Sequence, residues 1–326
     1  MTAKQLIDQR WSLVTLMGEG SFGAVWLAAD ARFAGRKVAV KLLKPEFTAM
    51  PQVVQRFENE ALALGHLHHA NLVQVLDRGV WQDNHYLVME YVEGHTLKDH
   101  LAQMAQQRQI FDIATVIAIF DQICAGVAAA HRGVAAGPVV HRDLKPSNLM
   151  LSQDPDGGFL VKILDFGIAQ LGGRNATRSG AQMGTLNYMA PEQLLGETRR
   201  VSTATDVFAL GVILLEMLTF HRYYDDETTW AAFVLRNEAA LPSVLVPLRS
   251  DIVPALWEVI FAAMRANPEQ RPFTADVLRA AVRQAVGLGP SAFQSFQGAL
   301  TSPRIAPTVR TTGPLPLGTV SPSAAA

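Results

Sequence analysis

The chain has 326 residues, 49% of them apolar, which is enough for one large or two small globular units. Its 28 basic and 29 acidic residues leave a formal net charge of -1, so no overall field attracts nucleic acid or an anionic membrane. The single cysteine, Cys124, excludes an internal disulfide framework and a thiolate cluster for zinc, and it suits a reducing compartment. Its apolar helical surroundings predict that the thiol is buried.

The first ninety residues predict mainly short strands. Runs rich in valine, leucine and aromatic residues are separated by Gly, Asp and Asn turns, and these runs are 11–18, 24–30, 37–43, 72–76 and 85–91. One helix interrupts them, because apolar residues from Val53 to Leu67 recur at close to helical spacing. The N-terminus lacks a basic start followed by an apolar run, so no secretory signal is predicted.

After Gly94 the pattern changes to long helices, which we expect at 112–131, 205–219 and 254–264. In the most apolar of them Asp206 and Glu216 bracket only nine uncharged residues, which is too short to span a bilayer and predicts a buried helix. No membrane segment is therefore expected, and the predicted location is cytoplasmic. A strand-rich half followed by a helix-rich half indicates two lobes of an α+β protein.

The last forty residues differ in composition from the rest. From Gly287 the chain is dense in Pro, Gly, Ser, Thr and Ala, with five prolines after residue 300. Such a segment cannot bury enough apolar surface to fold alone, so 287–326 is predicted to be a disordered tail.

A glycine-rich segment, GEGSFGAV, opens the first lobe with Gly18, Gly20 and Gly23. In a dinucleotide-binding unit these glycines would start a helix, and an acidic residue would follow about 20 positions later. Here they lead into a strand, and Lys41 stands eighteen positions after Gly23. This arrangement indicates a hairpin whose backbone amides lie over phosphates.

Lys41 ends an alternating strand and precedes two leucines, a costly place for an ammonium without a partner, although a solvated edge charge is the simpler alternative. The following helix offers two carboxylates. Glu60 shares a face with Phe57 and Leu64, whereas Glu58 points elsewhere, so Glu60 is the expected partner of Lys41.

The segment VVHRDLKPSNLM, residues 139–150, places Asp143, Lys145 and Asn148 within six positions. Taken alone it is typical of a polar surface loop. A zinc site on His141 is a further alternative, but the other clustered histidines, at 66–69, lie at a helix end away from any acidic pair, so zinc is disfavoured.

Ten segments occur in a sensible order and spacing: GEGSFGAV, VAVK, FENEA, HHANLV, YLVMEYVEG, HRDLKPSN, DFG, GTLNYMAPE, TDVFALG and NPEQRP. Over roughly residues 11–284 the chain resembles a protein kinase of the eukaryotic type, and more specifically the bacterial Hanks-type serine/threonine kinases. The resemblance implies a bilobal α+β fold, with a nucleotide-binding, β-rich N-lobe at 1–92 containing one key helix, and a mainly helical catalytic C-lobe at 93–286.

The resemblance also implies roles in phosphoryl transfer. Asp143 would accept or orient the proton of the substrate hydroxyl, and Lys145 would contact the γ-phosphate of ATP. Asn148 and Asp165 of DFG would hold Mg²⁺, which prefers oxygen ligands. The ring of His141 would lie in the core beneath the site.

The segment YLVMEYVEG would connect the lobes and carry the adenine contacts. The carbonyl of Glu90 and the backbone of Val92 would meet the base, and Met89 would close the back of the pocket. The residues that would sandwich the base are Val25, Ala39 and Met150. Ordinary core packing is the alternative for these apolar residues, because an adenine pocket is itself apolar.

The loop from 165 to 192 would order on phosphorylation. Thr177 and Ser179 are the candidate acceptors, and Arg142 would pair with the added phosphate; plain loop hydroxyls are the alternative. Thr185 would bond near Asp143 and Lys145. Structural support would come from Glu192 paired with Arg271, and from Asp206.

None of the six polar catalytic positions is substituted, so an active kinase for Ser/Thr hydroxyls of proteins is favoured, with ATP and Mg²⁺ and a possible homodimer for autophosphorylation. Ala70 and Asn267 are mild departures from the pattern, and the segment before His141 is slightly long. A catalytically silent scaffold is the second hypothesis. A small-molecule phosphotransferase is opposed by GTLNYMAPE, which resembles a peptide-binding shelf.

Overall fold

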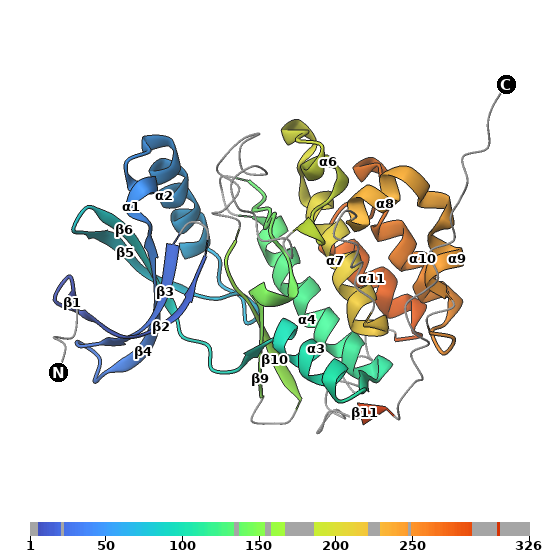
Figure 1. Ribbon diagram of the computed structural model, residues 1–326, viewed down its shortest axis with the longest axis horizontal. Coiled ribbons are helices and arrows are strands. Elements are labelled where there is room, and N and C mark those ends of the chain that lie inside the picture. The colour runs from blue at the N-terminus through green and yellow to red at the C-terminus, as the bar shows by residue number, and fades with distance from the viewer. Residues whose placement is uncertain are drawn as a thin grey trace.

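The computed structural model describes residues 6–20, 23–133, 137–153, 158–166, 186–220, 229–246, 249–288 and the backbone of 305–306; the side chains of Arg56, Glu60 and Asn237 are not described. Figure 1 shows a strand-rich N-terminal lobe and a helical C-terminal lobe, with the chain crossing between them after β6. The bilobal α+β prediction is confirmed.

A six-stranded antiparallel sheet in the order β1-β2-β3-β4-β6-β5 forms the N-terminal lobe. Its strands are β1 Leu6–Ile7, β2 Trp11–Glu19, β3 Gly23–Asp30, β4 Arg36–Leu43, β5 Val75–Trp81 and β6 Asn84–Glu90. Gln82 and Asp83, both with positive φ, form the two-residue turn between β5 and β6, as a tight hairpin requires. β4 is central, and Lys41 lies between Val25 of β3 and Leu87 of β6.

The helix predicted from Val53 is α2, Pro51–Gly65, which follows the short α1, Pro45–Thr48. Its predicted apolar face is buried at Val53, Phe57, Ala61 and Leu64. Phe57 and Ala61 join an apolar cluster with residues of β4 and β6, so burial of one face holds α2 against the sheet.

The strand predicted at 72–76 is displaced in the structure, where β5 begins at Val75. Leu72 makes an isolated parallel bridge to Ile163, and the N–H of Val73 donates to the Ile163 carbonyl at 3.0 Å. The apolar run therefore reflects burial against the C-terminal lobe as well as the start of a strand, and periodicity cannot separate the two.

The C-terminal lobe surrounds two apolar helices, α4 Ile113–Arg132 and α7 Thr203–Thr219. Every residue of α7 except Thr219 is buried, and both helices contribute to the main hydrophobic cluster. Around them lie α3 Leu97–Gln106, α6 Pro191–Leu194, α8 Trp230–Asn237, α9 Leu241–Leu245, α10 Pro254–Ala263 and α11 Ala275–Ala285. The helices predicted at 112–131, 205–219 and 254–264 are thus confirmed to within two residues at each end.

Helix α4 is 20 residues long and apolar enough to cross a membrane by length and composition, the one such helix in the described part of the chain. However, 78% of its most apolar window is buried inside the protein, as expected of a core helix. Cys124 of α4 is fully buried, and this burial raises the pKa of its thiol well above the ordinary value. The predicted buried thiol is confirmed.

Small sheets complete the C-terminal lobe. β7 His95–Thr96, β9 Leu149–Gln153 and β10 Phe159–Ile163 form a three-stranded sheet in the order β10-β9-β7. β8 Ile110–Phe111 pairs antiparallel with β11 Ile305–Ala306 of the predicted tail. Apart from 287–288 and 305–306, the tail lies outside the described residues.

Candidate active site

The catalytic-loop segment 139–150 is held from below by α7. Asp206 accepts hydrogen bonds from the backbone N–H groups of His141 and Arg142, both at 2.8 Å, and from His131 Nε2 at 2.8 Å. All three donors converge on one carboxylate that is 1% exposed, so the charge of Asp206 is compensated inside the core. Asp206 thus fixes the backbone directly before Asp143.

His141 is buried beneath the site, as the resemblance implies. Its Nε2–H donates to the carbonyl of Leu164 at 2.9 Å, and its Nδ1 accepts from the backbone N–H of Asp143 at 3.3 Å. Its ring lies 4.5 Å from that of Phe166. Both ring nitrogens are engaged within the protein, and the described residues contain no group of three metal-ligating side chains, so zinc at His141 finds no support.

Asp143, Lys145 and Asn148 converge as predicted. Lys145 Nζ lies 2.9 Å from Asp143 Oδ2. The side-chain amide nitrogen of Asn148 donates to the backbone carbonyl of Asp143 at 2.8 Å and to its Oδ2 at 3.2 Å. Because the amide nitrogen is directed to Asp143, the amide oxygen of Asn148 is the atom available to a metal ion.

Lys41 crosses from the N-terminal lobe to Asp165, with 2.7 Å between Nζ and Oδ1. Burial raises the pKa of Asp165, but the charge and hydrogen bond of Lys41, with the charge of Lys145, outweigh it, so the pKa lies below its ordinary value. Asp165 is therefore a carboxylate at neutral pH. The oxygen donors of Asp165 and Asn148 fit Mg²⁺, a hard cation that takes oxygen ligands.

The expected pair between Lys41 and Glu60 falls on a side chain outside the described residues. Glu58 was expected to point away from Lys41, and its carboxylate lies 3.4 Å from His85 Nδ1. In this structure the described carboxylate bonded to Lys41 is that of Asp165.

Four of the six predicted adenine residues gather in one apolar cluster. Ala39 and Met89 are buried in it, and Val25 and Val92 pack against it. Met150 is half-buried on β9, where it pairs with Lys162 of β10. Gly18 of β2 pairs with Val25 of β3, and Gly23 of β3 pairs with Leu43 of β4. The N–H of Gly20 donates to the carbonyl of Gly23 at 2.8 Å. The glycine-rich segment therefore forms the predicted hairpin.

The side chain of Glu90 points to a different surface from the adenine cluster. Its carboxylate accepts from Lys162 Nζ at 2.6 Å and from the backbone N–H of Gln74 at 2.9 Å. A pocket of about 680 Å³ lies beside the connector, lined by 90–95 with parts of α3, β9 and β10. Glu90 and Val92 line this pocket, but the other four predicted adenine residues, Val25, Ala39, Met89 and Met150, do not, so the pocket does not coincide with the predicted adenine site.

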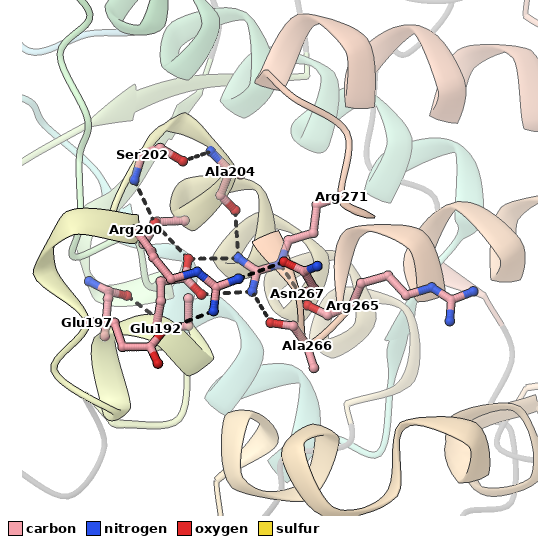
Figure 2. A network of polar contacts seen from close by, with 12 residues as sticks. Glu192, Glu197, Arg200, Ser202, Ala204, Arg265, Ala266, Asn267 and Arg271 are labelled. Atoms are coloured by element: carbon pink, nitrogen blue, oxygen red, sulfur yellow. Dashed lines mark hydrogen bonds and ion pairs between the residues drawn. The ribbon is translucent and has the colours of Figure 1, made fainter. Parts of the chain in front are cut away.

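Behind the site, Glu192 and Arg271 form the predicted ion pair. Two parallel hydrogen bonds join them, Nη1 to Oε1 at 2.9 Å and Nη2 to Oε2 at 2.8 Å, with both side chains at most 1% exposed. Figure 2 shows the surrounding network, in which Arg200 bonds Glu197 at 3.0 Å and Asn267 at 2.7 Å. The departure at Asn267 thus supplies an amide oxygen to Arg200 and to the N–H of Glu269.

Several predicted residues lie outside the described part of the chain. These are Thr177, Ser179 and Thr185, which belong to 167–185. The backbone of Arg142 is described: it has a φ of 65°, and its carbonyl accepts from Gln193 Nε2 at 2.9 Å.

Sequence reasoning missed two contacts at the site. One is His131, whose Nε2 bonds Asp206. The signal was a histidine on an apolar helix, which has to find a buried partner. The other is the bond from Gln193 to the catalytic loop, for which no sequence pattern gives a cue.

The profile of the protein kinase domain matches residues 11–282. The chain is 34% identical over 288 residues to "Serine/threonine-protein kinase A" of Synechocystis sp., covering 86% of this chain and 54% of that protein. It is 35% identical over 276 residues to "Serine/threonine-protein kinase Pkn1" of Myxococcus xanthus, covering 84% of this chain and 38% of that protein.

Among solved structures, the PknI kinase domain of Mycobacterium tuberculosis superposes with a TM-score of 0.67 at 22% identity, covering 87% of this chain and 99% of that one. This likeness shows the fold. The curated relatives are longer than the matched region, and the chain spans about half or less of their length. Since the family profile covers most of the sequence, the chain belongs to the protein kinase family, within its bacterial serine/threonine branch.

Proposed function

We propose that this protein transfers the γ-phosphoryl group of ATP to Ser/Thr hydroxyls of proteins, with Mg²⁺ as cofactor. The single observation that carries the proposal is the convergence of Lys41, Asp165, Asn148, Lys145 and Asp143 from separate parts of the chain. We assign residues 1–92 to the nucleotide-binding lobe, 93–286 to the catalytic lobe and 287–326 to a tail.

Each of these side chains has a role that its geometry supports. Phosphoryl transfer needs a positioned hydroxyl and charge neutralisation more than it needs covalent chemistry. Asp143, held by Lys145 and Asn148, receives and orients the proton of the acceptor hydroxyl. Lys41 and Lys145 neutralise phosphate oxygens, and Asp165 with Asn148 would hold the metal ion, which supplies electrostatic stabilisation of the transferring group.

The nucleotide contacts follow from the N-terminal lobe. We assign the phosphate contacts to the backbone amides of the hairpin with Gly18, Gly20 and Gly23, and the base to the apolar cluster around Ala39, together with Met150 and the backbone of Glu90 and Val92. Because Lys41 bonds Asp165, ligation of a metal by that carboxylate and contact of the ammonium with phosphate are coupled. We assign Glu60 as the residue that orients Lys41 when nucleotide is bound.

The direct test is transfer of labelled phosphate from ATP and Mg²⁺ to a generic basic protein. Asp143→Asn keeps the shape of the side chain and removes its basicity, so we expect a loss of about 10²- to 10⁴-fold. Lys41→Met is expected to lose activity to a similar extent. Lys37→Met is the matched control, because this lysine of the same strand is 60% exposed and reaches Glu93 only at 3.9 Å.

Equal labelling by wild type and Asp143→Asn would show a catalytically silent scaffold with a contaminating activity. Mass spectrometry of wild type after incubation with ATP and Mg²⁺ tests the proposed regulatory positions, Thr177 and Ser179, with Arg142 as partner of the added phosphate. Labelling of Asp143→Asn by added wild type would show that modification passes between two copies. Its absence, with wild type labelled, would show transfer within one chain.

A further inference from the structure

The side chain of Gln193 joins helix α6 to the catalytic loop by a hydrogen bond. Its Nε2 donates to the backbone carbonyl of Arg142 at 2.9 Å, and its Oε1 accepts from the backbone N–H of Ala190 at 2.9 Å. The two contacts fix the orientation of the amide. A flipped side chain would set NH₂ against N–H and oxygen against oxygen, so only this orientation satisfies both partners.

The carbonyl that Gln193 binds belongs to an unusual point of the backbone. Arg142 has a φ of 65°, in the left-handed region that residues with a side chain rarely adopt. Its N–H is already fixed by Asp206 at 2.8 Å. Gln193 therefore holds the opposite side of the same residue, and the carbonyl concerned is part of the peptide bond that leads into Asp143.

Helix α6 is itself firmly anchored, so it can act as a fixed support. Glu192, the neighbour of Gln193, is bound by Arg271, and it accepts a further bond from Thr205 Oγ1 at 2.8 Å. On the other side, Tyr188 donates its hydroxyl to Glu216 of α7 at 2.5 Å. The segment from 186 to 194 includes residues 186–192 of GTLNYMAPE, the motif that resembles a peptide-binding shelf. It is thus bonded both to the helical base and to the catalytic loop.

We propose that Gln193 is a positioning residue for phosphoryl transfer: it sets the peptide plane between Arg142 and Asp143, and so couples the segment 186–194 to the orientation of the Asp143 carboxylate. This inference rests on the proposed kinase function. Gln193 is not part of the apolar cluster around Ala39 that we assign to the base. Loss of its bond to Arg142 should therefore reduce kcat and leave the KM for ATP unchanged.

Gln193→Glu isolates the bond to Arg142. The introduced carboxylate still accepts from Ala190 N–H but places a second oxygen against the Arg142 carbonyl. We expect kcat to fall about fivefold to tenfold at pH 8, which corresponds to one lost hydrogen bond. A protonated carboxyl donates again, so the ratio of variant to wild-type kcat should rise toward one as the pH falls toward 5.

The pH profile separates positioning from simple support of α6, which would give a ratio that does not change with pH. The other charged groups bonded to these elements are Asp206, which accepts from the Arg142 N–H, and the Glu192–Arg271 pair. They are shared by variant and wild type, so they cancel in the ratio. Gln103→Glu, the same change at an exposed position of α3, is the control and should keep a ratio of one.

Gln193→Met, of similar length but unable to donate, should show the same loss at every pH without recovery, and it serves where the glutamate variant unfolds. A wild type that transfers no phosphate would overturn the proposed function itself. An active wild type with Gln193→Met at full kcat, or with a pH-independent loss in Gln193→Glu, overturns the positioning role alone.

Discussion

Arg271 makes the densest set of buried polar contacts in the described part of the C-terminal lobe, and its removal should be severe. All five of its N–H donors are used: Nη1 and Nη2 bind Glu192, and further bonds reach the carbonyls of Arg265, Ala204 and Ala266 at 2.7 to 3.0 Å. The guanidinium also lies over the ring of Phe208, 5.1 Å from the ring centre. Arg271→Met keeps the bulk of the side chain but leaves the Glu192 carboxylate, which is 1% exposed, without its cation.

Breaking one partner of a buried ion pair costs about 3–5 kcal/mol. With an unfolding entropy of about 2.1 cal/mol/K per residue over roughly 270 residues, this cost lowers the melting temperature by about 5–9 °C. Arg271→Lys returns the charge but offers a point donor in place of the planar fork, so it should recover less than half of the loss. Differential scanning calorimetry of the purified protein measures both shifts.

The control is Arg132→Met, because Arg132 pairs with Asp276 at the surface with the two side chains 59% and 47% exposed. Exposed pairs contribute at most about 1 kcal/mol, so this variant should melt within about 2 °C of wild type. If Arg271→Met melts as close to wild type as the control does, or if Arg271→Lys equals wild type, the fork geometry does not carry the stability assigned to it.

Two further predictions concern the connector and the response to acid. Gly94 has a φ of 149°, and a Cβ there would come within 2.3 Å of the Leu151 carbonyl oxygen. Gly94→Ala should therefore lower the free energy of unfolding by about 1–3 kcal/mol, measured in urea. Gly65→Ala is the control, because a Cβ at that position meets nothing within 4 Å. Unchanged stability in Gly94→Ala would show that the connector can move away from β9. Bonds from Arg10 lower the pKa of buried Asp30, so its contribution to stability is present above about pH 4 and is lost as the pH falls through the lower folded pKa. The melting temperature of wild type should therefore decline more steeply below pH 4 than that of Asp30→Asn. Parallel curves would contradict this.

Local sequence patterns predicted most of the strands and helices. The strands of the first lobe and the long helices of the second were predictable because burial of one face leaves a period of two or of 3.6. The run at 72–76 was assigned too early a start, because Leu72 bridges Ile163 of the other lobe and the strand begins only at Val75. A short apolar run reports that it is buried, and only the tertiary structure tells what covers it.

The candidate site was predictable where the motif itself contains the chemistry, as in Asp143, Lys145 and Asn148, which are five residues apart at most. The bond from Lys41 to Asp165 was not predicted, because it spans 124 positions. The predicted pair of Lys41 with Glu60 falls on a side chain outside the described residues and stays a prediction. Propensity and spacing describe local geometry, so a contact across 124 positions needs the positions of the lobes.

Ionisable residues inside apolar helices are the one kind of residue for which the sequence does predict that a distant contact exists. Asp121 and His131 in α4 and Asp206 and Glu216 in α7 are all at most 6% exposed, which the sequence could anticipate from the hydrophobic residues around them. Burying such a group without a partner is costly, so each requires one. Asp121 binds two arginines of α11 and Glu216 binds Tyr188, while His131 and Asp206 bind each other. A polar residue in an apolar helix therefore predicts that a tertiary bond exists. The bonds of Asp121 reach α11, the bond of Glu216 reaches the segment before α6, and Asp206 also accepts from the backbone of the catalytic loop, so two of these residues help to place the site.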